Sequence, residues 1–230
     1  RAHGADVEQE IAEWRKRLGR FRSLGIGIDR VDYTKGIPER LRAVDVLLER
    51  HPELVGEFVM AQIGVPSRTS IGDYDRLNRE TLQLVEDINA KWRRDDWEPI
   101  HFIHRHVEMP SMMALHRLAD CCIVTSLHDG MNLVAKEFVA SRFDNSGALI
   151  LSSFTGSARE LTSALLINPY SPDEIAEAIH KAIAMPAEER RHRMEQLRAA
   201  VEVNNIYRWA AKIMQELHRI EMRVRHASAA

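Results

Sequence analysis

The chain lacks several features that would point to a specialised environment. Its 230 residues include only two cysteines, Cys121 and Cys122, which are adjacent. Neighbouring residues of a strand point to opposite faces, so this pair predicts two small core side chains rather than a disulfide or a metal site. No apolar run approaches the roughly 20 residues that cross a bilayer, and the N-terminus lacks the apolar segment of a signal peptide. We therefore expect no membrane partner and a cytoplasmic protein.

The chain also lacks a strong charge of either sign. Its 32 Lys and Arg residues stand against 34 Asp and Glu residues, which gives a formal net charge of -2. Bulk electrostatics thus give no reason to expect binding to nucleic acid or to a membrane surface. Any phosphate ligand has to be held locally, by a few side chains and backbone amides.

The length suits one large domain or two small ones, and we expect a single α/β domain over residues 1–230. The chain starts at Arg1 without an initiating Met, and no strand precedes its first amphipathic helix, over residues 7–18. We interpret it as a part of a longer protein, whose other part carries some of the site. The small-residue run 227–230 is expected to be a frayed tail.

Apolar strand-like runs alternate with amphipathic stretches along the whole chain, which is typical of a parallel sheet covered by helices on both faces. The predicted strands are residues 23–28, 57–63, 100–103, 121–125, 148–151 and 165–167. The predicted helices after the first are 38–50, 71–94, 110–118, 132–142, 158–162, 172–184, 187–201 and 206–223. This pattern predicts a Rossmann-like doubly wound domain, in which ligands bind beyond the carboxyl ends of the strands.

The most informative stretch is HDGMNLVAKE, over residues 128–137, which follows the fourth predicted strand and opens into a helix. Backbone amides at a helix N-terminus have no intrahelical partner and favour anions, so phosphate is the ligand that we expect there. Asp129 lies in the turn, and Glu137 lies about two helical turns further on. Carboxylates beside a phosphate site suit hydroxyl groups, and therefore sugars. The alternative is a helix that Asp129 merely caps, with Glu137 in solvent.

A second loop, GIDRVDYTKG over residues 27–36, follows the first predicted strand. A GxG pattern there resembles part of the dinucleotide fingerprint, but Arg30 stands where the third glycine is needed, so we reject a nicotinamide site. Arg30 and Lys35 instead offer two cations that can grip a diphosphate and stabilise charge on it as it departs. The alternative is a surface pairing of Asp29 and Asp32 with these two cations.

Taken in order, these segments resemble the C-terminal half of trehalose-6-phosphate synthase, a retaining glycosyltransferase of GT-B fold. The segments that carry the resemblance are GIDRVDYTKGI from Gly27, VPSR from Val65 and DGMNLVAKE from Asp129. The likeness runs from about Leu24 to Arg219 and includes ARELTSA at 158–164 and NPY at 168–170.

The resemblance implies that this half binds a nucleotide sugar, usually UDP-glucose. A separate N-terminal domain, absent from this chain, would supply much of the acceptor site for glucose 6-phosphate. Arg30 and Lys35 would hold the diphosphate, and with Asp129 they are the expected catalytic residues. The resemblance also implies that Asp129 and the amides of Gly130, Met131 and Asn132 contact the donor sugar. The other implied contacts are those of the Leu133 and Val134 amides with phosphate, Glu137 with the ribose, Val107 with the base and Arg68 with the acceptor phosphate. The last helix is expected to cross back to the absent domain, and its apolar face also permits dimerisation.

No metal or other cofactor is expected. In the family the leaving phosphate is thought to accept the acceptor's proton, so no catalytic triad is needed. Asp73-Tyr74-Asp75 fits the motif of metal-using glycosyltransferases, but it lies in the first turn of a predicted helix, where acids favour the helix dipole. His101, His104 and His106 suggest zinc, yet strand alternation puts His101 on the other face, and no further cluster completes four ligands.

Three residues depart from those usual in the family. His128 stands where many relatives have Arg, His116 where an aromatic or apolar residue is usual, and Ser153 where Glu or Gln is frequent. Two other functions stay open. A glucosylglycerol-phosphate synthase would use ADP-glucose and glycerol 3-phosphate with the same motifs, and an inactive homologue would bind sugar nucleotide for regulation. By itself, the donor-binding half is expected to bind donor and to transfer negligible sugar.

Overall fold

A six-stranded parallel sheet forms the centre of the molecule. The computed structural model describes the backbone of residues 4–65 and 72–227 and the side chains of 4–65 and 75–220. The strands are β1 (Ser23–Arg30), β2 (Phe58–Val65), β3 (Ile100–Ile103), β4 (Cys121–Val124), β5 (Ala148–Ser152) and β6 (Leu165–Ile167). Their order in the sheet is β3-β2-β1-β4-β5-β6, and every neighbouring pair is parallel. The six predicted strands and the doubly wound fold are thus confirmed.

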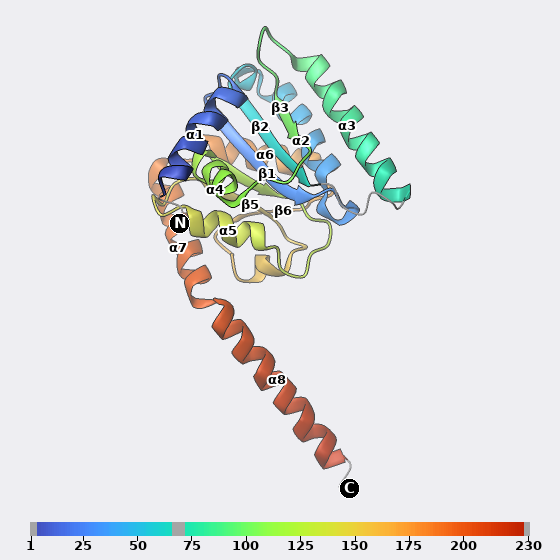
Figure 1. Ribbon diagram of the computed structural model, residues 1–230, viewed down its shortest axis with the longest axis vertical. Helices are drawn as coiled ribbons and strands as arrows, with labels where there is room; N and C mark the ends of the chain where they lie inside the picture. The colour runs from blue at the N-terminus through green and yellow to red at the C-terminus, as the bar shows by residue number, and fades with distance from the viewer. Residues whose placement is uncertain (1–3, 66–71, 228–230) are drawn as a thin grey trace.

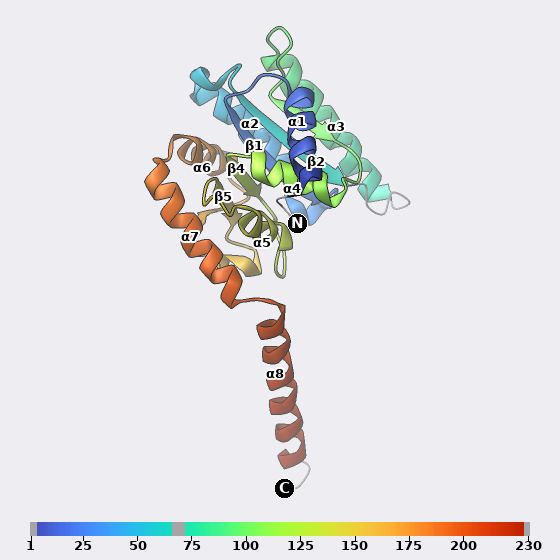
Figure 2. The ribbon, with the colours of Figure 1, turned by 60° about the vertical axis from the view of Figure 1, so that its left-hand side comes forward.

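Helices cover both faces of this sheet (Figures 1 and 2). One face carries α1 (Ala5–Leu18), α4 (Met109–Leu118) and α5 (Leu133–Ser141), and the other carries α2 (Ile37–Arg50), α3 (Gly72–Trp92) and α6 (Pro172–Ala184). Next, α7 (Ala187–Val203) packs on α5 and β5, and α8 (Ile206–Ala227) projects away from the body. No helix of the described residues is long and apolar enough to cross a membrane.

The strands are buried on both faces because helices cover both. β4 and β5 are buried throughout, and so is β1 up to its last residue. Cys121 and Cys122 are free and fully buried, as predicted for core residues. Burial raises the pKa of Cys122 to about 12, which keeps its thiol protonated at neutral pH.

The helix predicted over 158–162 is wrong. The structure instead forms a 3-10 turn, η3 (Gly156–Arg159), which begins earlier. The first two amides of η3 form hydrogen bonds with the loop after β4. The amide of Gly156 donates to the Asp129 carbonyl at 3.0 Å, and that of Ser157 donates to the Met131 carbonyl at 3.0 Å. Two further 3-10 turns, η1 (Tyr33–Lys35) and η2 (Pro52–Leu54), were not predicted.

The strand order places the two predicted site loops side by side. β1 and β4 are neighbours in the sheet, and the chain leaves them toward helices on opposite faces. This is the topological switch point of a doubly wound sheet, where a crevice forms beyond the carboxyl ends of the strands. The loops that carry Lys35 and Asp129 flank that point.

Candidate functional site

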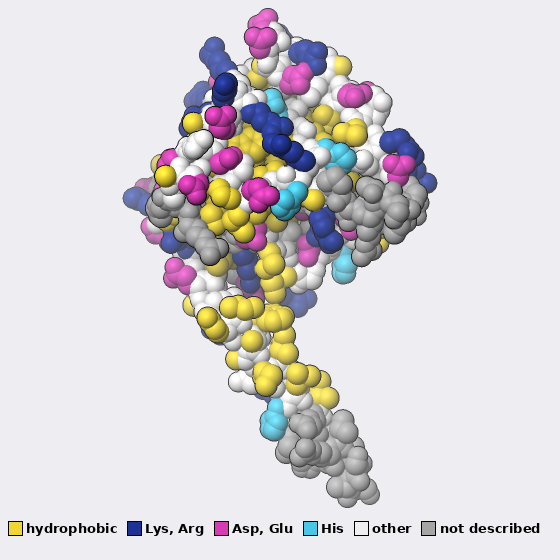
Figure 3. Space-filling view, in the orientation of Figure 1, with side chains coloured by type: hydrophobic (Ala, Val, Ile, Leu, Met, Phe, Trp, Pro, Cys, Tyr) yellow, Lys and Arg dark blue, Asp and Glu magenta, His cyan; other side chains and the backbone are white. Residues whose placement is uncertain are grey.

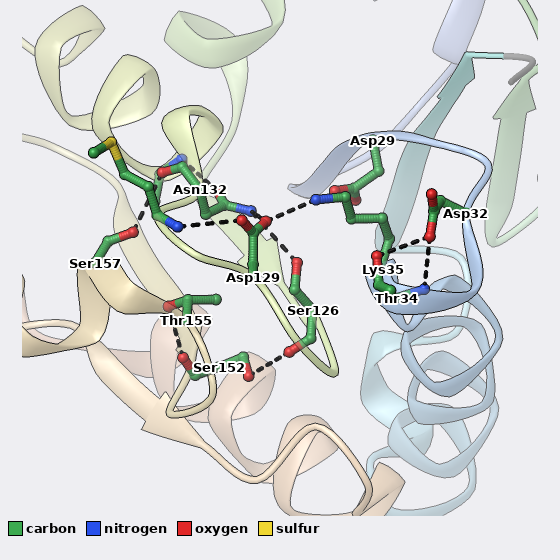
Figure 4. Close-up of polar contacts among 12 residues, drawn as sticks. Asp29, Asp32, Thr34, Lys35, Ser126, Asp129, Asn132, Ser152, Thr155 and Ser157 are labelled. Carbon is green, nitrogen blue, oxygen red and sulfur yellow. Dashed lines mark hydrogen bonds and ion pairs between the residues drawn. The ribbon is translucent and has the colours of Figure 1, made fainter.

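An ion pair joins the loop after β1 to the loop after β4 (Figure 4). Lys35 Nζ lies 2.7 Å from Asp129 Oδ2, and each side chain is 16% exposed. The backbone adds to this link, because the amide of Leu127 donates to the Thr34 carbonyl at 2.7 Å. The structure therefore brings together a cation and a carboxylate that the sequence predicted for one site, and both stay accessible to a ligand.

The acids of the first loop have other partners. Asp29 is buried and lies 2.8 Å from Arg40 Nη1, and burial raises the pKa of Asp29 in spite of that pairing. Asp32 Oδ1 accepts hydrogen bonds from the amide of Thr34 at 2.9 Å and from its hydroxyl at 2.8 Å. Arg30 is exposed at the end of β1 and forms no ion pair with any described residue. Partial burial opposes ionisation of Asp32, but the Thr34 hydrogen bonds and the charges of Arg30 and Lys35 lower its pKa. The alternative of a pairing within this loop is therefore wrong only for Asp29 and Lys35, whose ion pairs are with Arg40 and Asp129.

Asp129 is held as a carboxylate. Its Oδ1 accepts from the amide of Met131 at 3.3 Å, and its Oδ2 accepts from Asn132 Nδ2 at 3.2 Å as well as from Lys35. Partial burial opposes ionisation, but the Lys35 and Met131 hydrogen bonds and the Lys35 charge outweigh it, so the pKa of Asp129 lies below its usual value. An ionised and hydrogen-bonded carboxylate suits contact with sugar hydroxyls rather than proton donation.

The N-terminus of α5 is capped by Asn132 rather than by Asp129, which corrects the simple-cap alternative. Asn132 adopts φ 75°, and its Oδ1 accepts from the Ala135 amide at 3.0 Å. The preceding amides, those of Leu133 and Val134, have no intrahelical acceptor and none among the described residues. The Leu133 side chain is 60% exposed, so this end of the helix is open. It offers two amides and the positive end of the helix dipole to an anion.

The loop after β5 supports the Asp129 turn, and sequence reasoning missed it. Besides the two amides of η3, the hydroxyl of Ser152 donates to the Ser126 carbonyl at 2.6 Å (Figure 4). A Cβ on Gly156 would lie 2.0 Å from the Gly130 carbonyl oxygen, so only glycine permits this approach. The run of small residues SSFTGSA over 152–158 was the available signal.

A buried network behind the first loop was also missed. Arg40 is fully buried, and it donates to Gln62 Oε1 at 2.7 Å and to Thr125 Oγ1 at 3.1 Å. The Thr125 hydroxyl in turn donates to the Gly36 carbonyl at 2.8 Å. Since Gly36 follows Lys35 directly, this network fixes the position of the Lys35 backbone relative to β2 and β4.

Glu137 lies about one helical turn further along α5 than the open Leu133 and Val134 amides. It lines a groove of about 360 Å³ together with Met112, Met113 and His116. Partial burial raises the pKa of Glu137, and its carboxylate has no hydrogen-bond partner among the described residues. Val107, which precedes α4, is only 8% exposed and belongs to the hydrophobic core.

His116, the buried residue in this groove, gives a testable pH dependence. Desolvation, with the nearby Arg142 charge, lowers the pKa of His116 from 6.5 to about 4. Between these values the unfolded chain binds a proton that the folded chain does not, so folding stability falls as the pH drops. For the parent chain, this proton uptake should lower the free energy of unfolding by about 2 kcal/mol at pH 5 relative to pH 7.5, at about 1.4 kcal/mol per pKa unit. We expect His116→Leu to abolish this loss.

Urea unfolding of both proteins at the two pH values measures this effect. His192→Leu, on exposed α7, is the control and should leave the pH dependence of the parent chain unchanged. Equal pH slopes for the parent and His116→Leu would contradict the assignment of a neutral buried imidazole.

The remaining residues that the sequence analysis discussed have different outcomes. Arg68 lies outside the described residues. Asp73 and Asp75 lie in the first turn of α3, as predicted for residues that favour the helix dipole. β3 ends at Ile103, so strand alternation does not apply to His104 and His106, and the metal-compatible group found among the described residues contains neither.

The fold and the site define a glycosyltransferase of GT-B type. The chain belongs to glycosyltransferase family 20, whose sequence profile matches residues 1–219. It is 37% identical over 215 residues to alpha,alpha-trehalose-phosphate synthase [UDP-forming] of Pichia angusta, and this match covers 94% of the chain and 45% of that protein.

Solved structures agree with this family. A UDP-forming alpha,alpha-trehalose-phosphate synthase from Burkholderia xenovorans in complex with glucose-6-phosphate matches with a TM-score of 0.90 and 35% identity, over 94% of this chain and 48% of that one. A trehalose-6-phosphate structure from E. coli, bound with UDP-2-fluoro glucose, matches with a TM-score of 0.86 and 35% identity, over 91% and 46%. The chain thus spans about half the length of these relatives.

Proposed function

We propose that the chain is the donor-binding half of a trehalose-6-phosphate synthase, which transfers glucose from UDP-glucose to glucose 6-phosphate with retention of configuration. The observation that carries the proposal is the Lys35–Asp129 pair beside the open Leu133 and Val134 amides at the switch point. The names of the relatives support it, since they describe UDP-forming trehalose-phosphate synthases.

Each part of the site has a role in this proposal. The diphosphate lies against the Leu133 and Val134 amides, with Arg30 and Lys35 as countercharge. Asp129 and the backbone of 130–132 contact the sugar hydroxyls. Glu137 accepts from the ribose hydroxyls, and the Val107 backbone faces the base.

The transfer needs no protein nucleophile. The bond between the sugar's anomeric carbon and the diphosphate oxygen breaks, and the acceptor's hydroxyl oxygen bonds to that carbon. The released phosphate oxygen takes the hydroxyl proton. Lys35 and Arg30 stabilise the charge that develops on the leaving diphosphate, and Asp129 stays ionised throughout. No metal takes part in this scheme.

The acceptor side of the site belongs to the remainder of the enzyme in this proposal. An apolar stripe on α8 is largely exposed, and its members recur at helical spacing (Figure 3). They are Ile206, Trp209, Ile213, Leu217 and Ile220, between 40% and 65% exposed. We propose that this stripe packs against the N-terminal domain, and that Arg68 contacts the acceptor phosphate. Dimerisation of the isolated chain through the stripe is the other outcome, which sedimentation velocity would show.

Calorimetric titration with UDP and UDP-glucose tests the proposal. Glu137→Gln should weaken UDP binding about tenfold, because a hydrogen bond between a charged carboxylate and the ribose contributes about 1.5 kcal/mol. Glu202→Gln, on exposed α7, is the matched control and should change nothing. Failure of the folded chain to bind either ligand, or binding that Glu137→Gln leaves unaltered, would contradict the proposal.

The same titration separates the alternatives. Tighter binding of ADP-glucose than of UDP-glucose would favour a glucosylglycerol-phosphate synthase. A full-length protein that binds UDP-glucose yet forms no product would favour an inactive regulatory homologue.

A further inference from the structure

Two histidines and a glutamate meet at the far end of α2 from the site described above. His51 follows the last residue of α2, and Glu177 and His180 lie one turn apart on α6. One ligand atom from each of these three residues lies within 4.8 Å of the other two. Their separation in the sequence explains why sequence reasoning, which expected no metal, did not find them.

The surroundings of His51 match those of a metal-binding imidazole. His51 Nε2 is buried, has no hydrogen-bond partner, and lies 3.9 Å from Glu177 Oε1. On the other side of the ring, Nδ1 lies 3.4 Å from Glu53 Oε1. A proton on Nδ1 that points to Glu53 leaves the lone pair on Nε2. Carboxylates orient metal-ligating histidines in this way.

His180 can complete the group. Its ring stacks on that of His51 with 3.6 Å between centroids and 10° between planes. Lone pairs of stacked rings run parallel, so the His180 ring must turn to share an ion. Its side chain is 35% exposed, and the second torsion of a histidine side chain is soft. Arg50 is the competing cation, but it hydrogen-bonds Asp173, and its Nη1 is 4.0 Å from Glu177 Oε1.

We propose that His51, Glu177 and His180 bind one transition-metal ion, with water in the remaining position. Two imidazoles and one carboxylate suit Zn²⁺, Co²⁺ or Ni²⁺, whereas Mg²⁺ and Ca²⁺ prefer all-oxygen ligands. α2 begins directly after the Lys35 loop, and its 14 residues span about 21 Å, so the ion lies far from the transfer site. It joins α2 to α6 and takes no part in sugar transfer.

Titration of the untagged chain with Co²⁺ and Zn²⁺ at pH 7.5 tests this inference. We expect one ion per chain, visible absorption bands of bound Co²⁺, and a rise in melting temperature with Zn²⁺. His180→Ala and Glu177→Gln should each weaken binding at least tenfold and abolish the thermal shift, because they remove a ligand from the accessible side of α6 without changing its buried side. UDP binding should be unchanged in both.

His192→Ala, another exposed helical histidine, is the matched control and should bind metal as the parent chain does. Mg²⁺ at the same concentration should give no thermal shift. Absence of 1:1 binding, or binding that survives His180→Ala undiminished, would overturn the inference. Failure of UDP binding in the parent chain would instead bear on the proposed function alone.

Discussion

Replacing Lys35 with methionine is expected to weaken UDP-glucose binding about 100-fold, the largest effect of any single side chain in the site. The loss corresponds to about 2.7 kcal/mol, within the range for hydrogen bonds to charged groups. Two effects combine. The diphosphate loses a countercharge, and Asp129 loses the partner 2.7 Å away, so an unpaired carboxylate then faces a phosphate. Calorimetry of both proteins measures the change.

A double variant separates these two effects. Lys35→Met/Asp129→Asn removes the repulsive carboxylate as well, so it should bind UDP more tightly than Lys35→Met alone. Lys16→Met, on an exposed position of α1, is the matched control and should leave affinity unchanged. If Lys35→Met bound UDP-glucose like the parent chain, Lys35 would not be a diphosphate ligand.

Gly36→Ala is expected to lower the free energy of unfolding by about 2–5 kcal/mol, through left-handed strain together with overpacking. Gly36 has φ 61°, a conformation that disfavours any Cβ, and a Cβ there would lie 2.2 Å from the Thr125 carbonyl oxygen. That oxygen belongs to the backbone directly after β4, so it cannot move without disturbing the end of the strand. The Lys35 loop would shift with it, and UDP affinity should fall as well.

Gly56→Ala provides a close control for this experiment. Gly56 has φ 86°, and a Cβ there meets no atom within 4 Å. It therefore bears only the conformational strain, about 1–2 kcal/mol. Urea unfolding of the two variants should differ by the steric contribution. Equal losses would show that the approach of Gly36 to Thr125 is not tight.

The sheet was predictable because each strand is an apolar run that two layers of helices bury. Residues 121–125 and 148–151 contain almost no polar side chains, and a parallel sheet covered on both faces requires such runs. Strand order then follows from the crossover rules of doubly wound folds, so the meeting of Lys35 with Asp129 was also within reach.

The missed features depend on contacts between distant segments. The backbone amides of Gly156 and Ser157 bond to another loop, so local helical spacing at 158–162 predicted the wrong element. In the sequence, Arg40 has the position of an ordinary polar residue of an amphipathic helix. In the structure, its side chain is fully buried among Asp29, Gln62 and Thr125. Asn132, which has a positive φ of 75°, caps α5 in place of Asp129, which lies three residues earlier in the chain.

A crystal structure of the chain with UDP-glucose tests the central claim most directly. The claim is that the switch point between β1 and β4 binds the nucleotide sugar. We expect diphosphate oxygens within hydrogen-bond distance of the Leu133 and Val134 amides, Arg30 and Lys35 beside them, and Glu137 on the ribose. A nucleotide bound at another edge of the sheet, or one whose diphosphate contacts neither α5 amide, would contradict the account.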